Sequence, residues 1–299
     1  MIESKGLTKY FGDVCAVNHV DVTIKAGTAF GLLGTNGAGK STFLRILAGI
    51  LKQDLGVITV DGQDVFEAPE VKAKCFYISD DQYFFPNTTA KEVGAYYAAH
   101  YADFDTAAFN RMLSACDLPL ERKVNTFSKG MKKQLSLFAG LAARTPYLLC
   151  DETFDGLDPV MRQAVKSLMA DAIASRSLTP VIASHNLREL EEICDHVGLL
   201  HKGGLLLARD LEEMRTSVHK LQVVFPRQLT EADLPELDIV SLKSRGRVQT
   251  LIIRGEAEDI ERRIDKEQPV FCELLPLTLE ELFITETEVA GYEFPQLGI

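Results

Sequence analysis

Residues 34–42, GTNGAGKST, carry the clearest chemistry in the chain. Gly34, Gly39, Lys40 and Ser41 fit the pattern G-x-x-x-x-G-K-[ST], after an apolar run and before a helix-like one. Glycines let backbone N–H groups curl around phosphate oxygens, and a helix N-terminus adds its positive dipole end. We predict a phosphate-binding loop in which Lys40 reaches the β- and γ-phosphates and Ser41 ligates Mg²⁺. The other predicted nucleotide contacts are Thr35, Asn36, Gly37, Ala38 and Thr42.

A pair of acids follows a second apolar run, YLLCD at 147–151. Carboxylates at the edge of an apolar core are costly unless a cation or hydrogen-bond donors meet them. Beside the phosphate-binding loop, Asp151 would hold Mg²⁺ through water. Glu152 would lie next to the γ-phosphate and polarise an attacking water. The loop and the acids together therefore predict nucleotide hydrolysis.

The surrounding pattern alternates strands with helices, which favours an α/β fold with a mostly parallel sheet. Antiparallel β-segments open the chain, and residues 57–65 read as a hairpin that turns at Asp61-Gly62. Residues 86–144 are helical in pattern and are expected to form an inserted subdomain. The expected core strands are 28–34, 147–151 and 180–184, and the expected core helices are 40–51, 159–175 and 186–194.

The pattern changes after about residue 215. Residues 216–299 read as four strands, an amphipathic helix near 256–267 and a last helix, with Thr278 and Glu281 as its capping box. We expect a small α+β domain of unknown role there, after a nucleotide-binding domain at 1–215.

A third motif narrows the class. FSKGM at 127–131 places Ser128, Lys129 and Gly130 before a helical run, where a helix N-terminus suits an anion. This segment, about twenty residues before the acids, resembles the signature motif of ABC ATPases, usually LSGGQ. GLDP at 156–159 looks like the family's D-loop, and His185 matches its switch histidine. The resemblance to an ABC transporter ATP-binding subunit, most like those of exporters with a separate permease chain, covers residues 1–215.

The resemblance implies a fold, cofactors and partners. The fold would be the P-loop ABC ATPase core, and the cofactors ATP and Mg²⁺. Two such domains would pack head to tail, as a homo- or heterodimer, so that Ser128, Lys129 and Gly130 act on the partner's nucleotide. Catalysis would rest on Glu152, His185 and Lys40. Phe11 would stack on adenine, with Tyr10 as the alternative.

The match departs from the family at one functional position. Asp80 falls where a glutamine usually contacts Mg²⁺ and the attacking water, in a loop that meets the transmembrane subunit. Either Asp80 ligates the metal, or Gln82 reaches the site, or the loop signals differently. Aspartate oxygen suits a hard cation, although the γ-phosphate repels its charge.

Composition limits the remaining choices. The net charge of −11 and pI near 5.1 disfavour a nucleic-acid partner. The six cysteines are scattered, and the sequence predicts neither a signal peptide nor a membrane span. We expect a cytoplasmic ATPase that lies peripherally on the inner face of the cell membrane through integral-membrane permease subunits. The alternative is a soluble ABC ATPase that assembles or remodels a protein complex without transport.

Overall fold

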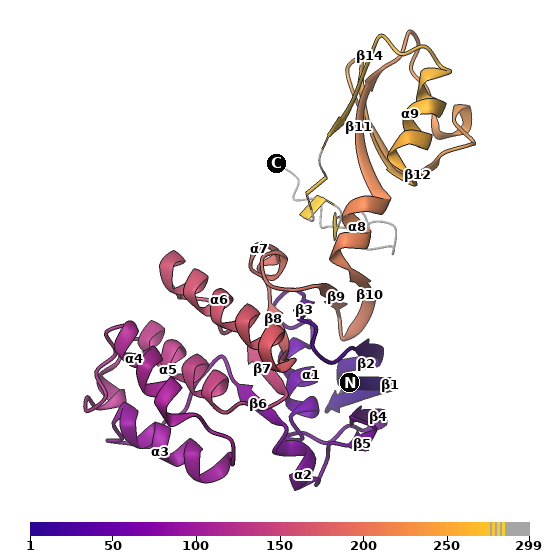
Figure 1. The fold of residues 1–299 in the computed structure, drawn as a ribbon. Helices are drawn as coiled ribbons and strands as arrows, with labels where there is room; N and C mark the ends of the chain where they lie inside the picture. The colour runs from indigo at the N-terminus through magenta and orange to yellow at the C-terminus, as the bar shows by residue number, and fades with distance from the viewer. Residues whose placement is uncertain (276, 279, 282, 285–299) are drawn as a thin grey trace. The chain divides into compact units, whose positions relative to one another are not determined.

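The computed structural model describes residues 1–284 except 276, 279 and 282. The chain forms two compact units, Met1–Ala208 and Arg209–Ile299 (Figure 1). The division falls a few residues before the sequence boundary at 215/216, so that helix α8 (Leu211–Ser217) belongs to the second unit. Among the described residues, no helix combines the length and apolar character that crossing a membrane requires.

A six-stranded sheet lies at the centre of the first unit, in the order β10-β9-β3-β8-β7-β6. Strands β6, β7, β8, β3 and β9 pair in parallel, as the sequence predicted. Every residue of β3, β7 and β8 is buried, which explains their uninterrupted apolar runs. The strands are β3 (Phe30–Leu33), β6 (Cys75–Ile78), β7 (Tyr147–Asp151), β8 (Thr179–Ser184), β9 (His196–His201) and β10 (Gly204–Asp210).

A second, antiparallel sheet has the order β2-β1-β4-β5. Its strands are β1 (Ile2–Phe11), β2 (Val14–Ile24), β4 (Leu55–Val60) and β5 (Gln63–Asp64). Asp61 and Gly62 connect β4 to β5 with φ of 52° and 77°, the left-handed pair that a tight hairpin turn requires. Helix α1 (Lys40–Leu47) contributes Phe43 and Leu44 to the core that both sheets share.

The inserted segment is helical, as predicted. It contains α3 (Ala90–His100), α4 (Thr106–Ala115), the 3₁₀ turn η1 (Val124–Thr126) and α5 (Lys129–Ala142). Each α-helix begins at a side-chain cap: Thr89 with Glu92, Asp105 and Ser128. The other helices of this unit are α2 (Pro69–Lys72), α6 (Pro159–Arg176) and α7 (Leu187–Glu191). The last is shorter than the expected 186–194, because the chain leaves the helix at Glu192.

The second unit contains the antiparallel sheet β12-β13-β11-β14. Leu221, Leu251 and Ile253 from the sheet pack against Ile260 and Ile264 of α9. The expected capping box is confirmed, because the Glu281 amide donates to Thr278 Oγ1 at 3.2 Å. The rest of the segment predicted as the last helix lies outside the described residues. The elements are β11 (Val218–Val224), η2 (Glu231–Asp233), β12 (Asp238–Arg245), β13 (Val248–Arg254), α9 (Ala257–Asp265) and β14 (Phe271–Leu275).

Candidate functional site

The carboxyl ends of β3, β7 and β8 lead into the three main groups of predicted site residues. Parallel neighbours end at one edge of the sheet, where such folds bind ligands. Residues 34–39 follow β3, Glu152 follows β7 and His185 follows β8. The order β3-β8-β7 therefore brings residues from distant parts of the sequence together.

The glycines of the loop are required by close backbone packing. A Cβ on Gly39 would lie 2.3 Å from the Ala16 carbonyl oxygen, and one on Gly34 would lie 2.6 Å from that of Leu200. Gly39 also has φ of 107°, which other residues rarely adopt. Helix α1 begins at the next residue and has no acidic side chain in its first turn. The loop thus presents a helix N-terminus suited to an anion.

Lys40 is buried inside this loop, with only 5% of the residue exposed. Its Nζ donates to the carbonyl oxygens of Gly34 (2.7 Å) and Thr35 (3.2 Å). The same atom lies 3.1 Å from Glu152 Oε1. The structure therefore joins the predicted phosphate-binding lysine directly to the predicted catalytic acid.

Asp151 is 1% exposed and accepts two side-chain hydrogen bonds. Ser41 Oγ donates to its Oδ1 (2.9 Å), and the Tyr77 hydroxyl donates to its Oδ2 (3.1 Å). Burial raises the pKa of Asp151, and these two hydrogen bonds oppose the rise. Burial raises the pKa of Tyr77 to about 12, so the phenol stays a donor. Sequence reasoning missed Tyr77, which belongs to no motif.

The side chains of Ser41 and Asp151 both offer oxygen atoms that suit Mg²⁺. A buried carboxylate is favourable when a cation meets it, and Mg²⁺ in nucleotide sites takes one or two protein oxygens beside phosphates and water. Among the residues that the structure describes, no cluster of three or more His, Cys, Asp or Glu side chains is placed to hold a metal ion. Ser41 and Asp151 thus offer the one or two protein oxygens that Mg²⁺ takes in nucleotide sites.

Glu152 lies between Lys40 and His185. Its Oε2 is 2.9 Å from His185 Nδ1, whereas its Oε1 faces Lys40. Its backbone has φ of 49°, the left-handed region, which costs a residue with a Cβ of order 1 kcal/mol or more. This strained conformation aims the carboxylate toward the loop, and strain of this kind concentrates at functional sites.

The signature residues occupy a separate surface position. Ser128 is exposed at the N-cap of α5 and accepts from the Met131 amide (3.2 Å). A Cβ on Gly130 would lie 3.2 Å from the Gly156 carbonyl oxygen, so the signature and D-loop segments are neighbours. Phe11 and Tyr10, at the end of β1, are 49% and 43% exposed. Among the described residues, no hydrogen bond, ion pair or ring contact joins Phe11 or Tyr10 to the phosphate-binding loop.

Asp80 lies beside a residue that the sequence did not single out. Its carboxylate is 3.1 Å from the buried Nζ of Lys133, and half of the Asp80 side chain is exposed. Gln82 Nε2 donates to the Ser79 carbonyl oxygen (3.0 Å). Neither residue contacts Ser41 or Asp151 among the described interactions, and metal ligation by Asp80 or Gln82 stays a prediction.

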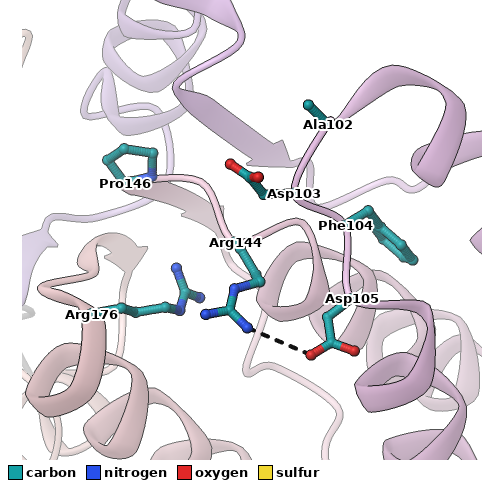
Figure 2. Close-up of a pocket in the computed structure, with 7 residues that line it drawn as sticks. All are labelled: Ala102, Asp103, Phe104, Asp105, Arg144, Pro146 and Arg176. Atoms are coloured by element: carbon teal, nitrogen blue, oxygen red, sulfur yellow. Dashed lines mark ion pairs between the residues drawn. The ribbon is translucent and has the colours of Figure 1, made fainter.

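A cavity of about 610 Å³ lies away from these residues (Figure 2). Arg144 and Asp105 form an ion pair at its wall, with 3.6 Å between Nη1 and Oδ2. Arg176 donates to the Thr145 (3.0 Å) and Leu141 (3.2 Å) carbonyl oxygens. Asp105 and Arg144 precede β7, and Arg176 ends α6 just before β8, whereas Asp151 and Glu152 lie at the carboxyl end of β7, so the cavity is separate from the predicted site.

The glycine loop, the buried lysine, the acid pair and the histidine define a P-loop ATPase. A sequence model described as ABC transporter matches residues 17–155. The ABC transporter ATP-binding protein YtrB of Bacillus subtilis (strain 168) is 34% identical over 286 residues, covering 96% of this chain and 98% of that protein. The chain therefore belongs to the ABC transporter ATP-binding proteins and is the ATP-hydrolysing subunit of an ABC transporter.

Other relatives agree with this assignment. The bacitracin transport ATP-binding protein BcrA of Bacillus licheniformis is 34% identical over 209 residues, or 69% of this chain and 68% of that protein. A solved ATP-binding subunit of an ABC transporter superposes with a TM-score of 0.66 at 26% identity, covering 72% of this chain and 92% of the other. A bacterial ABC transporter cassette solved as a dimer has the same fold, with a TM-score of 0.64 at 22% identity, over 71% of this chain and 99% of that one. Remodelling without transport is not favoured by these relatives.

Proposed function

We propose that the chain powers an exporter whose permease is a separate membrane protein, and that Glu152 directs the attack of water on ATP. The observation that carries the catalytic assignment is the Glu152 carboxylate, held between Lys40 at 3.1 Å and His185 at 2.9 Å beside the phosphate-binding loop. The FSKGM motif supports export, and the relative named for bacitracin transport supports a role in transport.

The roles of the residues follow from their contacts. ATP phosphates bind the backbone N–H groups of the loop and the N-terminus of α1. In this structure Lys40 is paired with Glu152. When ATP binds, its ammonium group contacts the phosphates instead and stabilises the charge that develops as the phosphoryl group is transferred. Glu152 orients the attacking water, and His185 holds the Glu152 carboxylate and faces the same phosphate. Ser41 and Asp151 would hold Mg²⁺, which would supply positive charge to neutralise the phosphates.

Completion of the site by a second ATP-binding subunit is the second part of the proposal. Ser128, Lys129 and Gly130 lie at the exposed or partly exposed start of α5, whose first turn has no acidic side chain. They suit a phosphate that arrives on another subunit. The exposed Phe11 is likewise free to meet adenine. The second subunit is either an identical chain or a related one.

The permease docks, we propose, near the loop that follows β6. Tyr83 and Phe85 are 77% and 53% exposed, and Tyr96 of α3 is 44% exposed. Their rings meet edge to face, with centroids 6.0 Å apart for Tyr83 and Phe85 and 5.5 Å apart for Phe85 and Tyr96. Grouped exposed aromatics are typical of protein interfaces. Such docking would hold the ATPase at the inner face of the cell membrane.

Replacement of Glu152 tests the catalytic assignment. Glu152→Gln keeps the size of the side chain and removes the charge, so it should keep ATP affinity, slow cleavage and accumulate a dimer with Mg-ATP. Turnover, nucleotide affinity and size-exclusion profiles measure these effects, with Glu191→Gln on α7 as the control. Near-normal turnover of Glu152→Gln would overturn the catalytic assignment. A size-exclusion profile that shows only monomer, with every candidate partner subunit present, would overturn the proposed dimer.

Purification in mild detergent tests the permease. A multi-span membrane protein should accompany the wild-type chain, and the Tyr83→Ser/Phe85→Ser double variant should lose it while keeping its own ATPase rate. A soluble scaffold in place of the membrane protein would refute the transport arrangement. Equal recovery with both chains would refute the docking surface.

A further inference from the structure

Lys133 joins three segments that sequence reasoning treated separately. It lies on α5, and its side chain is completely buried. Its Nζ donates to Asp80 Oδ1 (3.1 Å), in the loop after β6, and to the carbonyl oxygen of Glu152 (2.6 Å), directly after β7. The ammonium group therefore connects the signature helix, the loop with the unusual aspartate and the backbone of the predicted catalytic acid.

The backbone of Glu152 is fixed on both sides. Its amide donates to the Ala183 carbonyl oxygen of β8 (3.0 Å), and its carbonyl accepts from Lys133. These two bonds hold the peptide groups before and after the Glu152 Cα, and so they maintain φ at its left-handed value of 49°. The same conformation directs the carboxylate between Lys40 and His185.

A buried ammonium requires a compensating charge. Removing an ion from water is costly unless an opposite charge and further hydrogen bonds replace the lost solvation. Asp80 is the acidic partner of Lys133 among the described interactions. A neutral glutamine at position 80 would supply a hydrogen bond without the charge. The aspartate is therefore suited to a lysine at position 133.

We propose that Asp80 and Lys133 form a positioning pair that holds Glu152 for water attack, and that Asp80 serves this pair rather than the metal. The proposal rests on the proposed role of Glu152. Lys133 does not touch the reacting atoms and acts through the Glu152 backbone. Its loss should therefore lower kcat and leave the binding of ATP nearly unchanged.

The first experiment compares Lys133→Met with Lys132→Met, the neighbouring lysine on the same helix. In Lys133→Met, kcat should fall about 10- to 100-fold, the size of effect that misplacing a catalytic group has, while ATP affinity changes by about twofold or less. Lys133→Arg, which keeps the charge, should recover part of kcat. Lys132→Met should behave like the wild type. Thermal unfolding of each variant measures whether the fold is kept.

The second experiment combines Lys133→Met with Asp80→Ala. If the residues act as a unit, the double variant should be no slower than Lys133→Met alone, because the effects of residues in one network do not add. The Mg²⁺ concentration for half-maximal rate should stay at the wild-type value in Asp80→Ala and in Gln82→Ala. Asp80→Glu should recover part of the rate that Asp80→Ala loses.

Three results would overturn the pair. The first is wild-type kcat in a folded Lys133→Met, and the second is a double variant in which the two losses of kcat add. The third is a changed Mg²⁺ response in Asp80→Ala, which would make Asp80 a metal ligand. If Lys133→Met does not fold, the test is made with Asp80→Ala, because Asp80 is half exposed. Wild-type kcat in that variant would overturn the proposal. An active Glu152→Gln would remove the proposed function itself, whereas an inactive Glu152→Gln with an active Lys133→Met would remove only this inference.

Discussion

The two units of the chain bury polar groups in different ways. The ATP-binding unit buries Lys40, Asp151 and Lys133 among others, each with specific partners. In the described part of the C-terminal unit, the buried polar side chain is the neutral Gln249, which bonds both backbone groups of Leu229. Burying a charge is costly unless function or pairing requires it. Among the described residues, buried charge therefore lies in the unit that carries the nucleotide site, where Lys166 and Glu189, outside the predicted site, are buried as well.

The relatives also differ in how much of the two units they cover. The solved ATP-binding subunit covers 72% of this chain, whereas YtrB covers 96% and so includes most of the C-terminal unit. The relationship to YtrB therefore extends over both units of the chain.

The largest effect should come from Lys40→Ala. Removing the cation that stabilises the transferring phosphoryl group should lower turnover about 10²- to 10³-fold. A steady-state ATPase assay measures this loss, with Lys91→Ala, an exposed lysine paired with Glu121, as the control. Equal rates for the two variants would mean that buried charge does not mark the active site.

Asp151→Asn should lose activity and gain stability. The folded-state pKa of Asp151 is raised by burial, so the protonated form favours folding at low pH and this stability is lost as pH rises through the folded pKa. At neutral pH without Mg²⁺, Asp151→Asn should therefore unfold at a higher temperature than the wild type, and the difference should disappear in acid. Scanning calorimetry across pH checks the sign. A less stable variant at neutral pH would mean that the hydrogen bonds outweigh desolvation.

Tyr77→Phe should have a smaller effect. It removes one donor from the Asp151 carboxylate, and a hydrogen bond to a charged group contributes about 1.5–3 kcal/mol. We expect a changed Mg²⁺ requirement with turnover kept at saturating metal, measured by titrating Mg²⁺ against rate. The control is Tyr97→Phe, because Tyr97 is likewise partly buried but lies outside the site. Identical metal curves for Tyr77→Phe and the wild type would exclude a role for Tyr77 in holding Asp151.

The smallest effect on hydrolysis should come from the C-terminal unit. Ile253 is completely buried in its core, so Ile253→Ala should cost about 2–5 kcal/mol of that unit's stability. Turnover of the isolated chain below its unfolding temperature should stay at the wild-type level. Unfolding curves and ATPase rates of the same sample measure both. A parallel loss of turnover would show that the two units are coupled more closely than their compositions indicate.

The sequence was informative where local pattern determined structure. Glycine spacing identified the loop, apolar runs identified β3, β7 and β8, and the Asp61-Gly62 turn is confirmed. Lys133 and Tyr77 could not be identified in this way. A lysine on an amphipathic helix is normally solvated, and the partner that makes burial favourable, Asp80, is 53 positions away. Pairings of this kind appear only after the chain has folded.

The register between β7 and β8 has a consequence for insertions and deletions. Both strands are buried on both faces, so sliding one past the other by a residue would not expose an apolar face. Their alignment, Asp151 opposite Ala183, therefore depends on fixed points at the ends. Thr179 Oγ1 accepts from the Gly27 amide (2.7 Å), and the Glu152 amide donates to Ala183. Loss of one residue from β8 would leave the core equally apolar, but it would turn His185 away from Glu152. This part of the molecule tolerates changes of side chain more readily than changes of length.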